Sequence, residues 1–187
     1  MERTLNFIGR KASRRNLILC VLGSIITIAV MSIATQMLVY EVYGDFTMPD
    51  MRFGYTFDEI QTAFNTIGIE GLWTWVVAHS PDFLFPLAYS FAMMFGITME
   101  LNKVEKNSGL LRTTVFLPLV GGIADYIENT LILGQIAVFP NLSELVISIA
   151  SAVTLVKWAF LILSFRVIFV LLFLVVYKKI SSRTTKE

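Results

Sequence analysis

Residues 121–133 read GGIADYIENTLIL and place two carboxylates and an amide inside a long apolar run. Asp125 and Glu128 are the only charged residues between Arg112 and Glu144. A charged side chain at the middle of a bilayer costs about 3 kcal/mol on insertion scales, so these carboxylates must face protein or water rather than lipid. The stretch therefore predicts a helix inside a membrane-embedded bundle.

The composition supports the same conclusion. The 187 residues are 56% hydrophobic and only 16% charged, with a mean hydropathy of +0.71, which is typical of an integral membrane protein. A single cysteine, Cys20, and a single histidine, His79, exclude an intrachain disulfide, a CxxC redox centre and a thiolate or histidine-built metal site. We expect no metal, no cofactor and no nucleic-acid partner.

Four apolar stretches are long enough to cross about 30 Å of hydrocarbon. They cover residues 17–40, 82–100, 111–138 and 145–177. For the first stretch the alternative is a cleavable signal peptide, but the apolar run continues past the small residues around Ser32 without a break. We predict an all-α fold, a four-helix transmembrane bundle that forms a single domain over residues 1–187.

The first outer loop, residues 41–81, has helices of its own. Thr56 and Glu59 fit a capping box, and the apolar residues that follow predict a short amphipathic helix over 57–67. The tryptophan-rich stretch 71–77 is expected to lie along the membrane interface, where indole rings prefer to sit.

The sign of the charges predicts the topology. Twelve of the fifteen basic residues lie in the N-terminal segment, the 101–112 loop and the C-terminal tail, whereas residues 41–82 carry seven acidic residues and Arg52 alone. Because basic residues accumulate in cytoplasmic segments, we expect a multi-pass protein of the cell membrane with both termini cytoplasmic and the acidic loop outside. The two other basic residues, Lys157 and Arg166, fall inside the fourth span.

Helical phase indicates which polar groups share a face. Asp125, Glu128 and Asn129 are spaced i, i+3, i+4 and therefore lie on one face of the third span. Asp82 and Tyr89 lie on one face of the second span. The candidate ligand-binding residues are Asp82, Tyr89, Asp125, Glu128, Asn129, Lys157 and Arg166.

The two basic residues of the fourth span cannot both serve this site on an ideal helix, because nine residues separate them and place them on opposite sides. Depth was counted at about 1.5 Å per residue from the last cytoplasmic basic residue of each span. The count puts Arg166 level with Asp125, and Lys157 nearer the outer surface. Two pairings stay open: Arg166 with Asp125, or Lys157 with Asp82, Glu128 or Asn129.

Three short patterns carry a family resemblance. They are SPDFLFPLAY at 80–89, LP at 117–118 followed by DYIEN at 125–129, and TLVKW at 154–158. Together they resemble small four-span integral membrane proteins of bacteria over residues 49–158. The resemblance implies a four-span fold and no particular activity. Signal peptidase II does not fit, because it needs a catalytic aspartate on its last span and residues 145–177 contain none. Thiol oxidoreductases of the membrane need cysteine pairs, which are absent.

Three functions stay open. The first is a protein that binds, or helps to transport, a small polar or amphipathic ligand from the outer side through the Asp125 face. The second is an acid/base enzyme acting on a lipid or isoprenoid, with Asp125 and Glu128 as the acid/base pair. The third is an accessory subunit that binds a partner membrane subunit, with buried charges that only hold helices together. The second function requires a tunnel from the lipid to the carboxylates. The third function requires that the buried charged groups are shielded from water and all paired with one another.

Overall fold

The computed structural model describes residues 2–44, 52–104 and 109–184, and every element in these ranges is helical. The elements are α1 (Glu2–Lys11), α2 (Arg14–Thr35), the π-helical turn η1 (Gln36–Tyr40), α3 (Glu41–Tyr43), α4 (Phe57–Ala78), the 3₁₀ turn η3 (Ser80–Phe83), α5 (Phe85–Val104), α6 (Gly109–Thr113), the 3₁₀ turn η4 (Thr114–Phe116), α7 (Leu117–Val138) and α8 (Glu144–Thr184). The predicted all-α class is confirmed.

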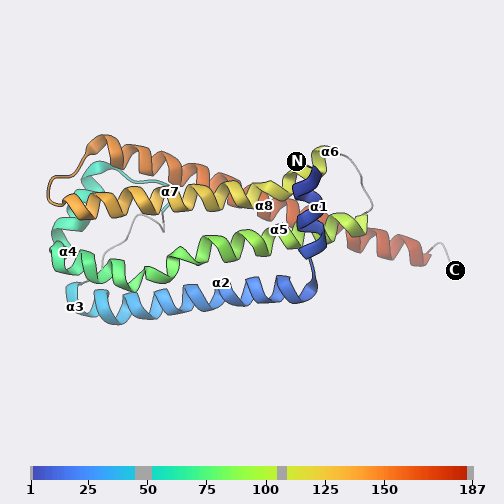
Figure 1. Cartoon of the computed structure of the whole chain (residues 1–187), viewed down its shortest axis with the longest axis horizontal. Coiled ribbons are helices and arrows are strands. Elements are labelled where there is room, and N and C mark those ends of the chain that lie inside the picture. The colour runs from blue at the N-terminus through green and yellow to red at the C-terminus, as the bar shows by residue number, and fades with distance from the viewer. Residues whose placement is uncertain (1, 45–51, 105–108, 185–187) are drawn as a thin grey trace.

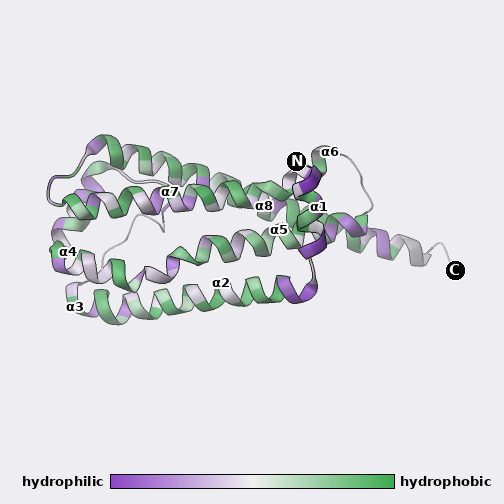
Figure 2. Cartoon of the chain, in the orientation of Figure 1, coloured by the Kyte–Doolittle hydropathy of each residue, from purple (hydrophilic) through white to green (hydrophobic). Residues whose placement is uncertain are grey.

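Four long helices, α2, α5, α7 and α8, run along the long axis of the molecule (Figure 1). Helix α7 packs along α8, and α5 packs against α2, α7 and α8. Helices α1 and α6 and the C-terminal part of α8 lie at one end, which we call the α1 end, while α3 and α4 lie at the other, the α4 end (Figure 1). Strongly hydrophilic residues gather on α1 and at the start of α2 (Figure 2).

Three helical segments are long and apolar enough to cross a membrane: Arg14–Tyr43, Leu111–Val138 and Glu144–Ser181. Helix α5 is the most enclosed of the four long helices. Half of its 20 residues are buried, among them Ser90, Thr98 and Glu100. A helix that contacts protein on most sides does not need a continuous apolar surface, which accounts for its more polar sequence.

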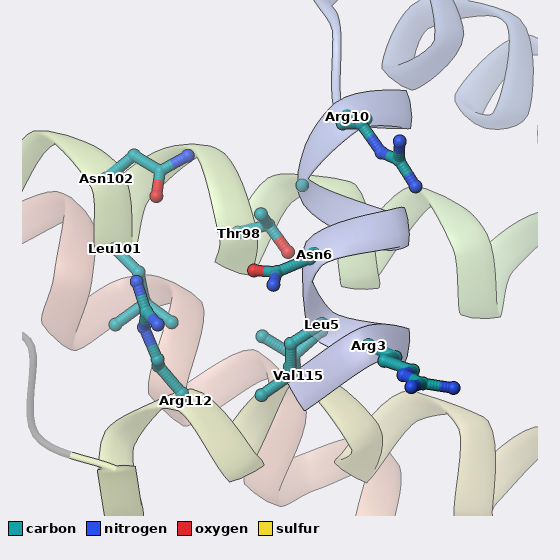
Figure 3. A pocket seen from close by; sticks show the side chains of 10 residues that line it. Arg3, Leu5, Asn6, Arg10, Thr98, Leu101, Asn102, Arg112 and Val115 are labelled. Carbon is teal, nitrogen blue, oxygen red and sulfur yellow. The ribbon is translucent and has the colours of Figure 1, made fainter. Parts of the chain in front are cut away.

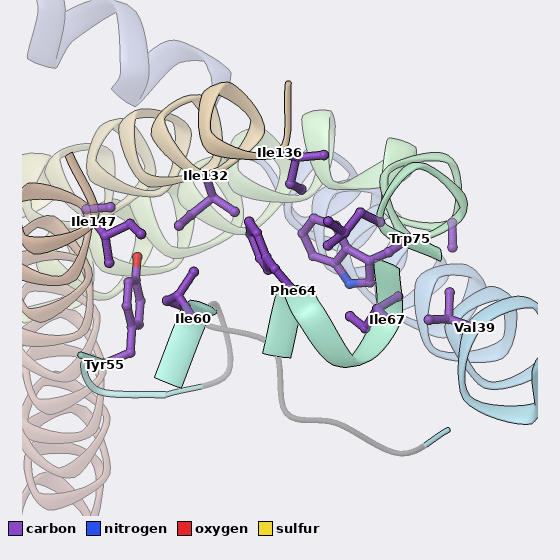
Figure 4. Close-up of a cluster of buried hydrophobic side chains, with 12 residues drawn as sticks. Val39, Tyr55, Ile60, Phe64, Ile67, Trp75, Ile132, Ile136 and Ile147 are labelled. Carbon is purple, nitrogen blue, oxygen red and sulfur yellow. The ribbon is translucent and has the colours of Figure 1, made fainter. Parts of the chain in front are cut away.

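Two apolar clusters form the core, one toward each end. The cluster at the α4 end, drawn in Figure 4, joins α4 to α7 and α8 through Phe64, Leu72, Ile136 and Ile147, all of them fully buried. The cluster at the α1 end joins α1 to the ends of α5 and α8. The stretches of α7 and α8 that lie between these two clusters carry five of the seven candidate residues, and Asp82 and Tyr89 lie on η3 and α5.

Helix α4 begins with the predicted capping box. The Thr56 hydroxyl accepts a hydrogen bond from the Glu59 amide, and the Glu59 carboxylate accepts one from the Thr56 amide at 2.8 Å, which completes the capping box. Gly68 interrupts the helix with φ of 69°, a conformation that glycine adopts without strain. The predicted helix 57–67 is therefore confirmed, and a second helical part follows directly to Ala78.

Several boundaries differ from the prediction. Helix α1 was not expected. Its Ile8 packs into the cluster at the α1 end, and such tertiary packing has no clear signal in a ten-residue stretch. Residues 80–83 form a 3₁₀ turn, so α5 begins at Phe85 rather than at residue 82. Helix α8 continues past the predicted residue 177 to Thr184.

Gly122 allows α5 and α7 to approach closely. A Cβ atom at this position would lie 2.3 Å from Ser90 Oγ and 3.2 Å from the Pro86 carbonyl oxygen. We expect Gly122→Ala to lower the free energy of unfolding by about 1–3 kcal/mol, because Ser90 would have to leave its hydrogen bond to the Pro118 carbonyl. The thermal unfolding midpoint in detergent measures this loss.

The matched control is Gly121→Ala, whose Cβ would lie 3.3 Å from Leu161 Cδ2, the flexible end of a side chain. This variant should lose less than half as much stability as Gly122→Ala. Equal loss in the two variants would mean that the contact between Gly122 and Ser90 does not determine the spacing of the helices.

Candidate functional site

Lys157 of α8 lies between two carboxylates of α7. Its Nζ atom is 2.6 Å from Glu128 Oε2 and 3.4 Å from Asp125 Oδ1. The three side chains are almost fully enclosed, with exposed fractions of 5% for Lys157, 8% for Asp125 and 1% for Glu128. We call Asp125, Glu128 and Lys157 the charged cluster. The predicted common face of the third span thus positions both carboxylates against the same cation.

Hydroxyl groups complete the surroundings of the carboxylates. The Thr154 hydroxyl donates to Glu128 Oε1 at 2.5 Å, and the Tyr55 hydroxyl lies 3.4 Å from the same oxygen. The Tyr89 hydroxyl donates to Asp125 Oδ2 at 3.0 Å. Thr154 lies one turn before Lys157 on α8, so a single face of that helix provides both a cation and a hydroxyl donor.

The charged cluster contains two acidic groups and one basic group. If both carboxylates are ionised, the enclosed group has one net negative charge. Removing such a charge from water costs several kcal/mol that hydrogen bonds only partly offset. One further positive charge, a proton or another monovalent cation, would balance the cluster.

A second polar pair lies on the side of the charged cluster that faces the α4 end. The Asn129 amide donates to Asp82 Oδ2 at 2.5 Å, and the Tyr126 hydroxyl donates to the Phe83 carbonyl oxygen at 2.5 Å. Asp82 and Asn129 are half-buried, unlike the charged cluster. The candidate residues of η3 and α5 therefore meet those of α7 in two layers, Tyr89 with Asp125 and Asp82 with Asn129.

His79 lies between α4 and η3, outside the long helices. Burial lowers the pKa of His79 to about 4, although the Trp75 carbonyl oxygen beside its ring acts in the opposite direction. The ring stacks on Trp75 with 4.2 Å between centroids. At neutral pH His79 is therefore uncharged and supplies no positive charge to Asp82 or to the charged cluster.

Residues 52–56, which precede α4, cover the charged cluster, and we call them the covering segment. The Trp158 indole donates to the Arg52 carbonyl oxygen at 2.8 Å, and the Tyr55 amide donates to Ser151 Oγ at 2.9 Å. The ring of Phe53 lies 5.1 Å from that of Trp158. These contacts hold the segment across α8 and direct the Tyr55 hydroxyl toward Glu128.

The predicted alternative with Arg166 as the counter-charge is not what the structure forms. Arg166 lies on an exposed face of α8, and it has no ion pair with any residue that the structure describes. The depth count placed Lys157 too far out, because it assumed that Lys178 and Arg112 lie at the same level. The C-terminal part of α8 extends beyond the ends of the other helices (Figure 1), which brings Lys157 down to Asp125.

Two residues of the site were not among the predicted ones. Thr154 has a usable signal, since it is three residues before Lys157 and shares its face. Tyr55 has none, because it reaches Glu128 from a loop 73 positions away in the sequence. Within the described ranges, no group of three or more histidine, cysteine, aspartate or glutamate residues could hold a metal ion.

We compared the chain with known protein families, curated proteins and solved structures, and none of them matches it.

Proposed function

We propose that the chain crosses the membrane four times, through α2, α5, α7 and α8, with both termini in the cytoplasm. Three of these helices have the length and apolarity of membrane spans. The 20 residues of α5 reach about 30 Å, which matches the hydrocarbon thickness. Its position among the other three supports a span that lipid contacts little. The basic residues at the α1 end support the cytoplasmic placement of that end.

We further propose that the charged cluster is a binding site for one exchangeable monovalent cation. The observation that carries this proposal is the count of two enclosed carboxylates against one ammonium group. A proton occupies the site in the closed form, and a small cation such as a metal ion or an organic ammonium replaces it. Intramembrane carboxylates are most often found where ions or protons move, which favours transport or a transport-associated role.

The ligand enters from the outer side, past the covering segment. Tyr55 precedes α4, and its hydroxyl lies at the long distance of 3.4 Å from Glu128 Oε1. Half-buried Asp82 and Asn129 lie between the charged cluster and the α4 end, where they provide polar contacts along the way. Displacement of the covering segment would uncover Glu128 first.

An accessory role is the second candidate, and the close pairing of the charged cluster favours it. In that role Lys157 joins α7 to α8, and the cluster has no ligand. An acid/base enzyme is favoured less, because carboxylates with exposed fractions of 8% and 1% offer a lipid substrate no contact in this conformation.

Proton exchange in reconstituted vesicles tests the proposal. The purified full chain is placed in lipid vesicles with a pH-sensitive dye inside and a slightly acidic interior, and Na⁺, K⁺ or tetramethylammonium is added outside. We expect at least one of these cations to release protons from the interior faster than in protein-free vesicles. If none does so, while the protein in the vesicles is folded, the accessory role is correct.

A further inference from the structure

A cleft at the α1 end lies apart from the charged cluster and is not used by the proposed function. Its volume is about 740 Å³, and it lies between α1, the C-terminal part of α5 and the α6–η4 turn. Leu101 and Val115 form a buried apolar floor. The polar lining consists of Arg3, Asn6, Arg10, Thr98, Asn102 and Arg112. Figure 3 shows Asn6 facing Thr98, with Arg112 on the same side of α1, whereas the Arg3 and Arg10 side chains extend toward the other side of that helix.

The charged residues that line this cleft are all basic. Three arginines line it, and no acidic residue does. None of the three guanidinium groups forms an ion pair within the described part of the chain, whereas the neighbouring Lys103 is paired with Glu100. Arginine presents a planar set of donors that matches the oxygen atoms of a phosphate group. The chemistry of the lining therefore suits a phosphate-bearing anion.

Helix α1 places the cleft at the level of the membrane surface. It lies across the end of the bundle rather than along it (Figure 1), and Ile8 anchors it to the cluster at the α1 end. Phe7, on the same helix, is 53% exposed. A short helix with basic residues and an exposed aromatic residue lies in the interface between headgroups and acyl chains. At this depth the phosphate that meets the cleft is that of a lipid.

We propose that the cleft binds the phosphate of an anionic lipid headgroup. The apolar floor contacts the glycerol region, Arg112, Asn6 and Thr98 contact the phosphate oxygens, and Arg3 and Arg10 add positive charge at the rim of the cleft. This proposal depends on the membrane placement of the helices but not on the charged cluster. The lipid site and the cation site can therefore fail independently of each other. Binding would fix α1 against α5 and α6, and would make the stability of the α1 end depend on the lipid composition.

Native mass spectrometry and thermal unfolding test the proposal with the full chain. The protein is measured in nanodiscs of phosphatidylcholine with and without phosphatidylglycerol, and in detergent with inorganic phosphate. We expect phosphatidylglycerol to raise the unfolding midpoint and to remain bound on transfer to the gas phase. Arg112→Gln should weaken phosphatidylglycerol binding about fivefold, as expected for one basic residue at an anionic surface.

Arg15→Gln is the matched control, because Arg15 is an exposed arginine at the same end of the bundle but outside the cleft. This variant should bind phosphatidylglycerol as the wild type does. An equal loss of binding in Arg15→Gln would overturn the proposal in favour of diffuse surface charge. Inorganic phosphate that raises the midpoint as much as the lipid does would overturn it in favour of a free-anion site.

Discussion

Lys157→Met is expected to have the largest effect of any single substitution in this chain. It removes the ammonium group and leaves Asp125 and Glu128 enclosed without their common cation. Breaking a buried ion pair by removing one partner typically costs about 3–5 kcal/mol, because the remaining charge has no compensation. We expect a fall in the unfolding midpoint in detergent and loss of the monodisperse peak in size-exclusion chromatography.

Two further variants show whether charge causes this loss. Arg166→Met removes a positive charge from the same helix at an exposed position, and it should change the stability by less than about 0.5 kcal/mol. The triple variant Lys157→Met, Asp125→Asn, Glu128→Gln removes all three charges and should regain most of the stability. If Lys157→Met alone is as stable as the wild type, the ion pairs do not hold α7 to α8.

Glu128→Gln is expected to separate binding from folding. The amide has the same shape as the carboxyl group. Its oxygen can accept from the Lys157 ammonium while its NH2 donates to the Thr154 hydroxyl, which in turn donates to the Ala150 carbonyl oxygen, so the packing is kept. One carboxylate then faces one ammonium group, and the cluster needs no additional cation. We expect a stability close to that of the wild type, with cation-driven proton release in vesicles reduced to the level of protein-free vesicles.

Asp125→Asn should behave in the same way, because it also leaves one carboxylate, that of Glu128, opposite one ammonium group. Glu128→Ala is the contrasting variant, since it leaves a cavity and removes the acceptor for Thr154, and it should lose stability as well as function. If Glu128→Gln fails to fold, and adding Lys157→Met restores folding, the cluster connects helices and binds no ligand.

Sequence reasoning located the faces of the helices better than their relative depth. The i, i+3, i+4 spacing of Asp125, Glu128 and Asn129 put them on one face, and the structure has the first two buried and Asn129 against Asp82. The face of a helix on which a residue lies depends only on residue spacing within that helix, so it can be predicted from the sequence. Depth depends on where neighbouring helices end, and the extension of α8 beyond the bundle was not visible in its composition.

The contacts that close the site were the least predictable. Tyr55 was not among the predicted site residues, and no periodicity connects it with Ser151 or Glu128. Its position follows from the path of the loop across α8, which tertiary packing decides. By contrast, the capping box at Thr56 is a local feature with a local cause, and it was predicted correctly.

The protonation of the charged cluster is the most direct test of the central claim. Infrared difference spectroscopy of the folded protein at neutral pH, comparing the wild type with Glu128→Gln and Asp125→Asn, reports whether an enclosed carboxyl group retains its proton. We predict a protonated carboxyl band in the wild type that disappears in at least one of the two variants and that decreases when the effective cation of the vesicle assay is added. A wild-type spectrum in which both groups are ionised without any added cation would contradict the proposed site.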